Sequence, residues 1–234
     1  MLILGIESAT TQVGCAIGGH EGILASALSA RDRRHAESLA PQIDFVRRQA
    51  GIELTDLGAV AVDVGPGLYT GLRVGITTAI TLAHALGIPM VGVPSLDLVA
   101  FPLRFSDRQV VVAIDARRGE VFHSRYRPVP GGVQRVSEPS VGPPEEVASE
   151  IVASGEEVLL VGDGAERHAT AFDGIGEIDL VDRGFAHPSA AALVELAHAR
   201  ALREEFVRPD QIEPLYLRRP DAQARWSEAV GRGR

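Results

Sequence analysis

Short apolar runs recur along the first hundred residues and predict strands. They cover Leu2–Glu7, Val13–Gly18, Ile23–Ala30, Ala59–Val64 and Met90–Val93. The first three are separated by loops short enough for hairpins, so we expect them to pair in an antiparallel manner.

Between these strands the apolar residues follow a helical period. The pattern predicts helices from His35 to Ala50, from Thr70 to Leu86 and from Leu96 to Leu103. Pro41 falls inside the first pattern, which predicts a kink or a helix start near it. Thr70 and Ser95 are of the residue types that cap helix N-termini, so we expect them to cap the second and third helices.

The order of these elements matches the half-unit of the actin-like and ribonuclease-H-like folds. A second run follows, with strands predicted over residues 110–115, 120–126 and 158–161 and helices over 143–153 and 188–205. We therefore expect an α/β, two-lobed actin-like ATPase (ribonuclease-H-like) fold. Residues 1–105 would form the N-terminal lobe and residues 106–234 the C-terminal lobe. Whether residues 214–234 pack back on the first lobe is left open.

Composition and charge narrow the class of protein. The 234 residues are 45% hydrophobic and 23% charged, which is typical of a globular chain. The net charge of −8 argues against clamping a nucleic acid alone, although residues 218–234 form a basic tail. Cys15 is the only cysteine, and no apolar run is long enough to span a bilayer. The N-terminus lacks a basic leader, so a cytoplasmic location is the default.

The stretch VGPGLYTGLRVG at residues 64–75 joins a strand to a helix, as phosphate-binding loops do. Its spacing fits neither the P-loop nor the dinucleotide pattern. The loops of an actin-like phosphate clamp would be Glu7–Thr11 and Asp115–Gly119. The first has no glycine in its turn, and the second has Ala116 and Arg117 where small residues or glycine would let phosphate approach the backbone. A nucleotide would contact Glu7, Thr10, Gly67 and Arg117. The alternative is a structural turn, and we expect a poor ATPase.

Small residues recur on one side of the helix that follows this stretch, which would let a second helix approach closely. From pattern alone, contact with the protein's own sheet is an equal alternative. A docking surface on both helices would comprise His35, Leu39, Ile43, Val46, Gly71, Val74, Gly75, Thr78, Ala79 and Leu82. We expect Leu or Arg at position 75 or 79 to block docking and leave the fold intact.

The sequence offers little support for catalysis. None of the seven histidines stands three or four residues from another, so no helix presents a pair of metal ligands. Ser95 lies in Gly-Val-Pro-Ser-Leu-Asp, which lacks the esterase nucleophile pattern. We expect no catalytic residue, no metal site and no cofactor bound by this chain alone.

The order of motifs resembles the TsaB (YeaZ) family of bacterial tRNA threonylcarbamoyladenosine synthesis. The resemblance rests on Leu4–Thr10, the helix start at His35–Leu39, Gly65–Gly75, Gly87–Val93, Asp115–Phe122 and Pro214–Arg218. It therefore extends from residue 2 to about residue 218. Glu7 stands where Asp is usual in the family, and Tyr69 where Phe is usual.

The resemblance implies a non-catalytic paralogue of TsaD, the catalytic partner. TsaD has a metal-binding His-x-x-x-His after the strand that follows the glycine-rich helix, and Val93–Asp97 here has no histidine. The family implies docking on TsaD through the two helices and recruitment of the ATPase TsaE. ATP and a metal would sit in partner subunits. The complex transfers threonylcarbamoyl to adenosine 37 of tRNAs that read ANN codons, so this chain would meet tRNA through the complex.

The alternative function is enzymatic: a stand-alone ATPase or a metal-dependent glycoprotease-like hydrolase. It would need phosphate clamps and metal ligands that the sequence does not supply. A homodimer through the same helices is compatible with either function, because an unpartnered apolar face tends to self-associate.

Overall fold

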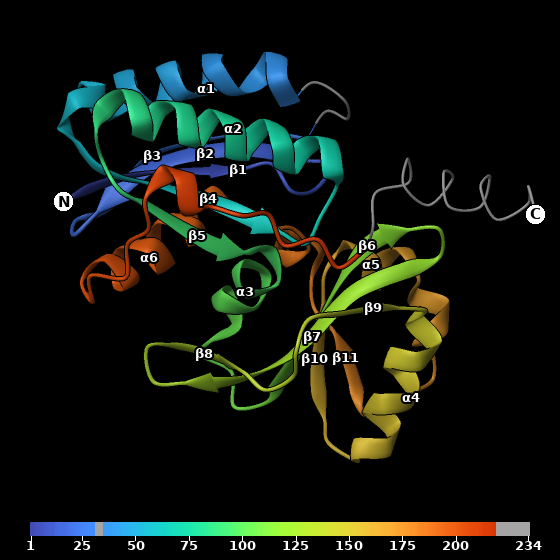
Figure 1. The fold of residues 1–234 in the computed structure, drawn as a ribbon. Coiled ribbons are helices and arrows are strands. Elements are labelled where there is room, and N and C mark those ends of the chain that lie inside the picture. Colours follow the sequence, from blue (N-terminus) through green and yellow to red (C-terminus); the bar gives the residue numbers. More distant parts are fainter. Residues whose placement is uncertain (31–34, 219–234) are drawn as a thin grey trace, which may run out of the picture.

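The computed structural model describes residues 1–30 and 35–218, which fold around two β-sheets (Figure 1). In the first sheet the strand order is β3-β2-β1-β4-β5. Its strands are β1 (Leu2–Glu7), β2 (Val13–Gly19), β3 (Gly22–Ser29), β4 (Leu57–Gly65) and β5 (Met90–Pro94). The hairpin strands pair in an antiparallel manner as predicted, and β1, β4 and β5 are parallel.

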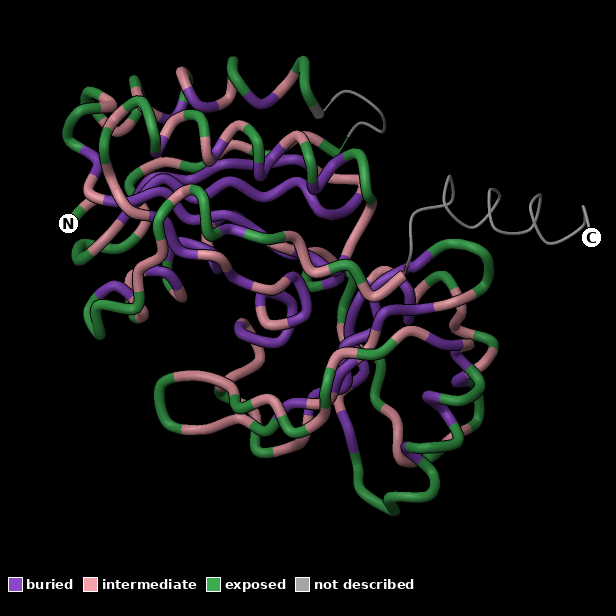
Figure 2. The backbone as a smooth tube through the Cα atoms, viewed as in Figure 1, coloured by how far each residue is buried: buried purple, intermediate pink, exposed green. Residues whose placement is uncertain are grey.

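Helices cover both faces of this sheet. α1 (His35–Ala50) and α2 (Tyr69–Leu86) lie side by side on one face, and α6 (Ala190–Ala201) covers the other. Alternate residues of β1 point to the two helical layers: Leu4 packs with α1 and α2, and Ile3 packs with α6. The strand is therefore apolar from Leu2 to Ile6, and in Figure 2 it is one of the buried backbone segments.

The second sheet follows the order β11-β10-β6-β7-β8, with β9 paired to β7. Its strands are β6 (Gln109–Arg117), β7 (Glu120–Val129), β8 (Gly132–Arg135), β9 (Ser140–Gly142), β10 (Val158–Val161) and β11 (Ile178–Leu180). The helices around it are α3 (Ser95–Ala100), α4 (Pro144–Ser154) and α5 (Asp163–Arg167). Short 3₁₀ turns occupy Leu54–Asp56, Phe101–Leu103, Ala169–Ala171, Arg183–Phe185 and Pro209–Gln211. This architecture is the two-lobed actin-like fold that the element order predicts.

The first three helices start within one residue of the predicted positions, but their predicted caps differ. α1 runs through Pro41, so the helix does not begin there. α2 begins at Tyr69 after Leu68, and α3 begins at Ser95 after Pro94, both without a side-chain cap. The predicted capping roles of Thr70 and Ser95 are therefore wrong. The Ser95 hydroxyl instead donates a hydrogen bond to Asp63 Oδ1, at 2.6 Å.

The chain returns to the first sheet after α6, along a path that we call the return segment, residues 202–218. The backbone of Val207 exchanges two hydrogen bonds of 2.9 Å with Met90, and Leu215 N–H donates to the carbonyl of Val64 at 2.7 Å. Arg218 then reaches the second sheet, where it contacts Glu120 and donates to the Ala116 carbonyl at 3.0 Å. The remaining basic tail, 219–234, lies outside the described residues.

Within the described ranges, no helix combines the length and the apolar character needed to cross a membrane.

Candidate functional site

The apolar stripes of α1 and α2 face the protein's own core. Leu39, Ile43 and Val46 of α1 are at most 6% exposed and pack in one cluster with Ala79 of α2. Gly71 and Gly75 are also buried. These residues therefore contact the chain's own sheet. The sequence pattern had left this contact and contact with a partner helix as equal alternatives. His35 is the first residue of α1, and its side chain lies outside the described part.

Gly75 is small because Ser8 lies against it. The Ser8 hydroxyl donates to the Gly71 carbonyl at 2.8 Å, and a Cβ at position 75 would overlap Ser8 Oγ. Ala79 is fully buried. A Leu or Arg at either position would therefore disturb the core, and the expectation that such a change leaves the fold intact is wrong. The sequence pattern could not exclude this outcome, because small residues are required both where a helix approaches a sheet closely and where it approaches a partner closely.

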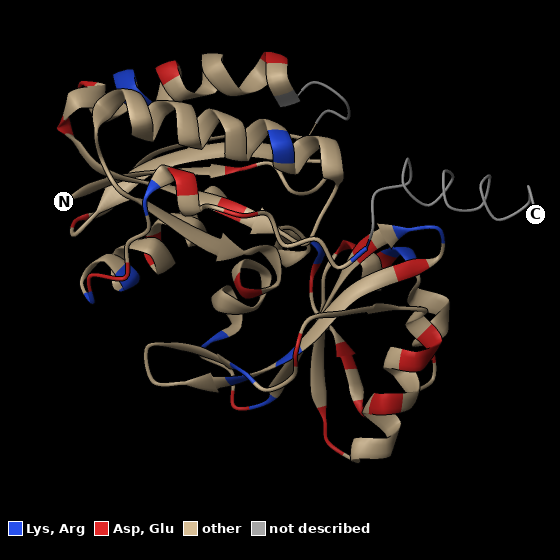
Figure 3. Cartoon of the chain, viewed as in Figure 1, with Lys and Arg blue, Asp and Glu red and all other residues tan. Residues whose placement is uncertain are grey.

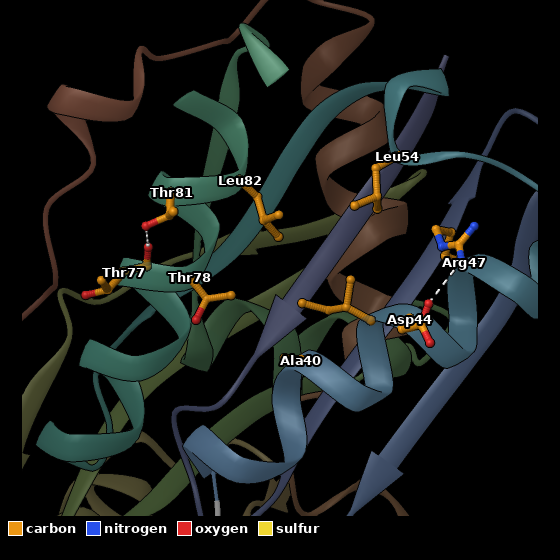
Figure 4. Close-up of a pocket in the computed structure, with 9 residues that line it drawn as sticks. Ala40, Asp44, Arg47, Leu54, Thr77, Thr78, Thr81 and Leu82 are labelled. Atoms are coloured by element: carbon orange, nitrogen blue, oxygen red, sulfur yellow. Dashed lines mark hydrogen bonds and ion pairs between the residues drawn. The ribbon is translucent and has the colours of Figure 1, made fainter. Parts of the chain in front are cut away.

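A groove remains between the two helices on the outer side. Its volume is about 390 Å³. From α2, Thr78 and Leu82 point toward α1, and Leu54 lies at one end of the groove (Figure 4). Its described lining is Ala40, Ile43, Asp44, Arg47, Leu54, Thr77, Thr78, Thr81 and Leu82. Of the predicted interface residues, Ile43, Thr78 and Leu82 line this groove, and half-buried Val74 does not.

The polar groups of the groove are largely satisfied within the chain. Thr78 Oγ1 donates to the Val74 carbonyl and Thr81 Oγ1 to the Thr77 carbonyl, each at 2.8 Å. Arg47 pairs with Asp44 and with Glu53, each at 3.0 Å. A ligand that entered the groove would therefore meet methyl and methylene groups and few free hydrogen-bonding groups.

Sequence reasoning missed the outward residues of the groove, Ala40, Thr77 and Thr81. Ala40 is exposed on α1, and Thr77 and Thr81 are exposed one turn apart on α2. Their common signal is small size at solvent-facing positions of the two helices.

The predicted nucleotide residues meet at the cleft between the sheets, where the space is closed. Leu68 N–H donates to the Ala9 carbonyl at 2.6 Å, and a Cβ at Gly67 would overlap that carbonyl oxygen. The space bounded by Thr10, Asp115 and Arg117 has a volume of about 10 Å³. Such a space holds about one water molecule, so a triphosphate does not fit this conformation.

Carboxylates at this cleft are buried. Glu7 Oε1 accepts the Ala9 N–H at 2.8 Å, while Oε2 has no hydrogen-bond partner. Burial raises the pKa of Glu7 well above its usual value, and the nearby Asp63 carboxyl adds to the shift. Burial likewise raises the pKa of Asp63 to about 7, against the hydrogen bonds from Ser95 and the Gly65 N–H.

The turn between β6 and β7 closes the opposite side of the cleft. Arg117 and Arg118 both have left-handed backbone conformations, with φ of 63° and 57°. Asp115 accepts the Arg117 N–H at 2.9 Å, and its other oxygen lies 3.3 Å from both Arg117 Nη1 and Arg167 Nη1. The arginine charges are thus directed to Asp115. Among the described residues, no group of three or more His, Cys, Asp and Glu is arranged to hold a metal ion.

Comparisons with known proteins agree with this architecture. Residues 22–226 match the family model described as TsaD, tRNA N6-adenosine threonylcarbamoyltransferase. An uncharacterized protein of Mycobacterium leprae is 36% identical over 94% of this chain, which spans 56% of that protein's length. The tRNA threonylcarbamoyladenosine biosynthesis protein TsaB of Haemophilus influenzae is 32% identical over 86% of this chain and 85% of its own length.

Among solved structures, YeaZ from Pseudomonas aeruginosa superposes with a TM-score of 0.81 at 27% identity, covering 92% of this chain and 99% of that one. The family model, the near full-length TsaB relative and this structural match together cover both sheets and the α1–α2 layer. The chain therefore belongs to the TsaB (YeaZ) proteins of the threonylcarbamoyltransferase family.

Proposed function

We propose that this chain is a non-catalytic subunit in the synthesis of threonylcarbamoyladenosine in tRNA. It takes part in this modification in the cytoplasm by binding a TsaD-type transferase through the α1–α2 groove. The observation that carries the proposal is the groove itself, which has a volume of about 390 Å³ and is lined mainly by alanine, threonine, isoleucine and leucine side chains between two helices that lie side by side. The pathway is inferred from the TsaB relatives, which are named as tRNA threonylcarbamoyladenosine biosynthesis proteins.

The closed cleft favours a non-catalytic role for this chain over catalysis by this chain. The loop at Gly67 and Leu68 is hydrogen-bonded to Ala9 where a nucleotide phosphate would lie. ATP and the metal are then supplied by the transferase and by a TsaE-type ATPase, and tRNA contacts the assembly through those partners. Without the transferase, the same groove joins two copies of this chain in a symmetric pair.

Binding to the cognate TsaD tests the proposal directly. We expect the full chain and TsaD to elute together from a size-exclusion column, and depletion of this chain to remove threonylcarbamoyladenosine from tRNA. Separate elution together with unchanged modification would overturn it.

A pair of matched variants locates the surface. Thr81→Arg places a charged side chain at the groove, and we expect it to weaken TsaD binding at least tenfold by calorimetry. Ser149→Arg on α4 is the control, because Ser149 is also exposed and its hydroxyl also donates one turn back, to the Glu145 carbonyl at 2.8 Å. Equal binding by both variants would place the interface elsewhere, and equal melting temperatures show that both are folded.

A further inference from the structure

A second cavity opens between the two sheets, on the side away from the closed cleft. Its volume is about 550 Å³, within the usual range of small-molecule sites, roughly 300–1,000 Å³. The hairpin end at Gly19 and Gly22 and helix α6 bound it on the first-sheet side. Tyr126 of β7 and Val133 of β8 bound it on the second-sheet side. A molecule bound here would touch both lobes.

The lining of this cavity carries the charge opposite to that of the whole chain. Among the described residues that line it are four arginines, Arg104, Arg135, Arg200 and Arg203, against the two carboxylates Asp97 and Glu195. The net charge of the chain is −8. In Figure 3, arginine positions are coloured on α6, on the turn after α3 and along β7 and β8, which are elements that line this cavity.

The innermost arginines share one carboxylate. Asp97 Oδ1 accepts hydrogen bonds from Arg135 Nη2 at 2.6 Å and from the Tyr126 hydroxyl at 2.9 Å. Asp97 Oδ2 lies 3.5 Å from Arg200 Nη2. Two guanidinium groups therefore face a single negative charge, although the side chains of Arg135 and Arg200 are only 30% and 27% exposed. In addition, Arg135 Nε is buried and has no hydrogen-bond partner.

The outer arginines have acceptors of their own but retain donors. Arg104 Nη2 lies 3.3 Å from Glu195, and its guanidinium stacks on the Phe101 ring at 4.0 Å. Arg203 pairs with Glu205, which is absent from the cavity lining, and its side chain is 60% exposed. Since a guanidinium carries five N–H donors, neither arginine is saturated by these contacts.

We propose that this inter-lobe cavity binds a small organic phosphate monoester. The shared Asp97 leaves one guanidinium charge uncompensated, and a phosphate supplies the missing negative charge. The arginines approach from α6, β8 and the turn after α3. Phosphate oxygens accept from several directions, whereas the two oxygens of a carboxylate lie in one plane and suit one fork. The organic part packs on Ile23 and Val133, which line the cavity and are partly exposed.

The proposal is independent of TsaD binding, because it concerns a different surface, and it is tested on the isolated full chain. Ribose 5-phosphate and adenosine monophosphate are the probes, with ribose and adenosine as uncharged controls. We expect calorimetry to show saturable binding of one or both phosphates and none of the uncharged compounds. Absence of binding by both phosphates, or equal binding of adenosine and its monophosphate, would overturn the proposal.

Variants assign the binding to this cavity. We expect Arg135→Gln to weaken phosphate binding at least tenfold and Arg203→Gln to weaken it severalfold. Asp97→Asn should tighten it, because it removes the competing carboxylate. Arg183→Gln is the control, since Arg183 is 87% exposed and lies outside the cavity.

Arg203→Gln keeps the test decisive if Arg135→Gln does not fold, because Arg203 is mostly exposed. Phosphate binding that is unchanged in Arg203→Gln and in every folded Arg135 or Asp97 variant would place the ligand elsewhere and contradict the proposal.

Discussion

At the scale of single residues, the cleft between the sheets is defined by carboxyl groups that are buried with incomplete hydrogen bonding. Glu7 Oε2 and Asp63 Oδ2 both lack a partner. A charged oxygen in that position costs free energy, so the folded chain favours the protonated acids. A folded-state pKa above the unfolded value means that the folded chain holds protons that the unfolded chain has released.

Stability should therefore fall as pH rises. For Asp63 the window runs from its unfolded value of 3.8 to its folded value of about 7, and the Glu7 shift acts in the same direction. We expect the free energy of unfolding to decrease across this window by on the order of a few kcal/mol. Asp63→Asn, which keeps the Oδ1 acceptor, should flatten the decrease measured by urea unfolding at pH 5, 6, 7 and 8.

Asp173→Asn is the control for this pH dependence, because Asp173 is exposed. A slope that is the same in the wild type and in Asp63→Asn would show that this carboxyl ionises in the folded protein without cost.

Ser8 and Gly75 form a second residue-scale constraint. A Cβ at position 75 would overlap Ser8 Oγ but would lie 3.4 Å from Ser8 Cβ. We expect Gly75→Ala alone to destabilise the fold by roughly 1–3 kcal/mol, the usual cost of overpacking. In a Ser8→Ala background the same change should stabilise by up to about 1 kcal/mol, because alanine favours the helix over glycine.

Chemical unfolding of the four members of this double-mutant cycle measures the effect. Additive values would mean that the two side chains do not compete for the same space.

At the scale of elements, the order of strands and helices could be predicted because each apolar period is a local property. The hairpin of β1–β3 and the helices α1 and α2 appear where the pattern places them. The caps at Thr70 and Ser95 could not be predicted in the same way, because a hydroxyl far from its partner in sequence can prefer that partner, as Ser95 does with Asp63. Whether the small residues of Gly71–Leu82 face the sheet or a partner helix could not be predicted either, because both contacts require small residues.

Helix α6 shows the limit most clearly. Its sequence position follows the strands of the second sheet, yet Leu193, Val194 and Ala197 pack in the core of the first. Gly5 of β1 permits this approach, because a Cβ there would lie 2.8 Å from Val194 Cγ2. No local pattern indicates which sheet a helix covers, because that choice is made by residues far apart in the chain.

Because α6 packs on the first sheet, shortening one of its buried side chains should destabilise the first sheet more than the second. Leu193→Ala should cost about 2–5 kcal/mol, as expected for a fully buried leucine. Local openings should reduce hydrogen-exchange protection in β1 and β4 more than in β6. Ile151→Ala on α4, which is equally buried but packs on the second sheet, is the matched control and should show the reverse. Equal loss in both sheets would mean that the two lobes open as one unit.

At the scale of the whole molecule, the lobes are joined by more than their covalent link. α3 packs between the sheets, and the return segment binds the first sheet at Val64 and Met90 before Arg218 reaches Ala116. The α1–α2 groove faces outward, while the cleft and the arginine-lined cavity lie between the lobes. Docking on the groove and binding in the cavity thus involve separate surfaces of the protein.

The position of α6 and the return segment has a consequence for how the protein is made. The ribosome releases β1 first, but one face of that strand stays uncovered until Ala190–Ala201 has emerged. The carbonyl of Val64 gains its hydrogen bond later still, when Leu215 has been synthesised. The second sheet, whose strands are contiguous in sequence, is ready to fold earlier. The lobe whose strands come first in the chain is therefore the one completed last during synthesis.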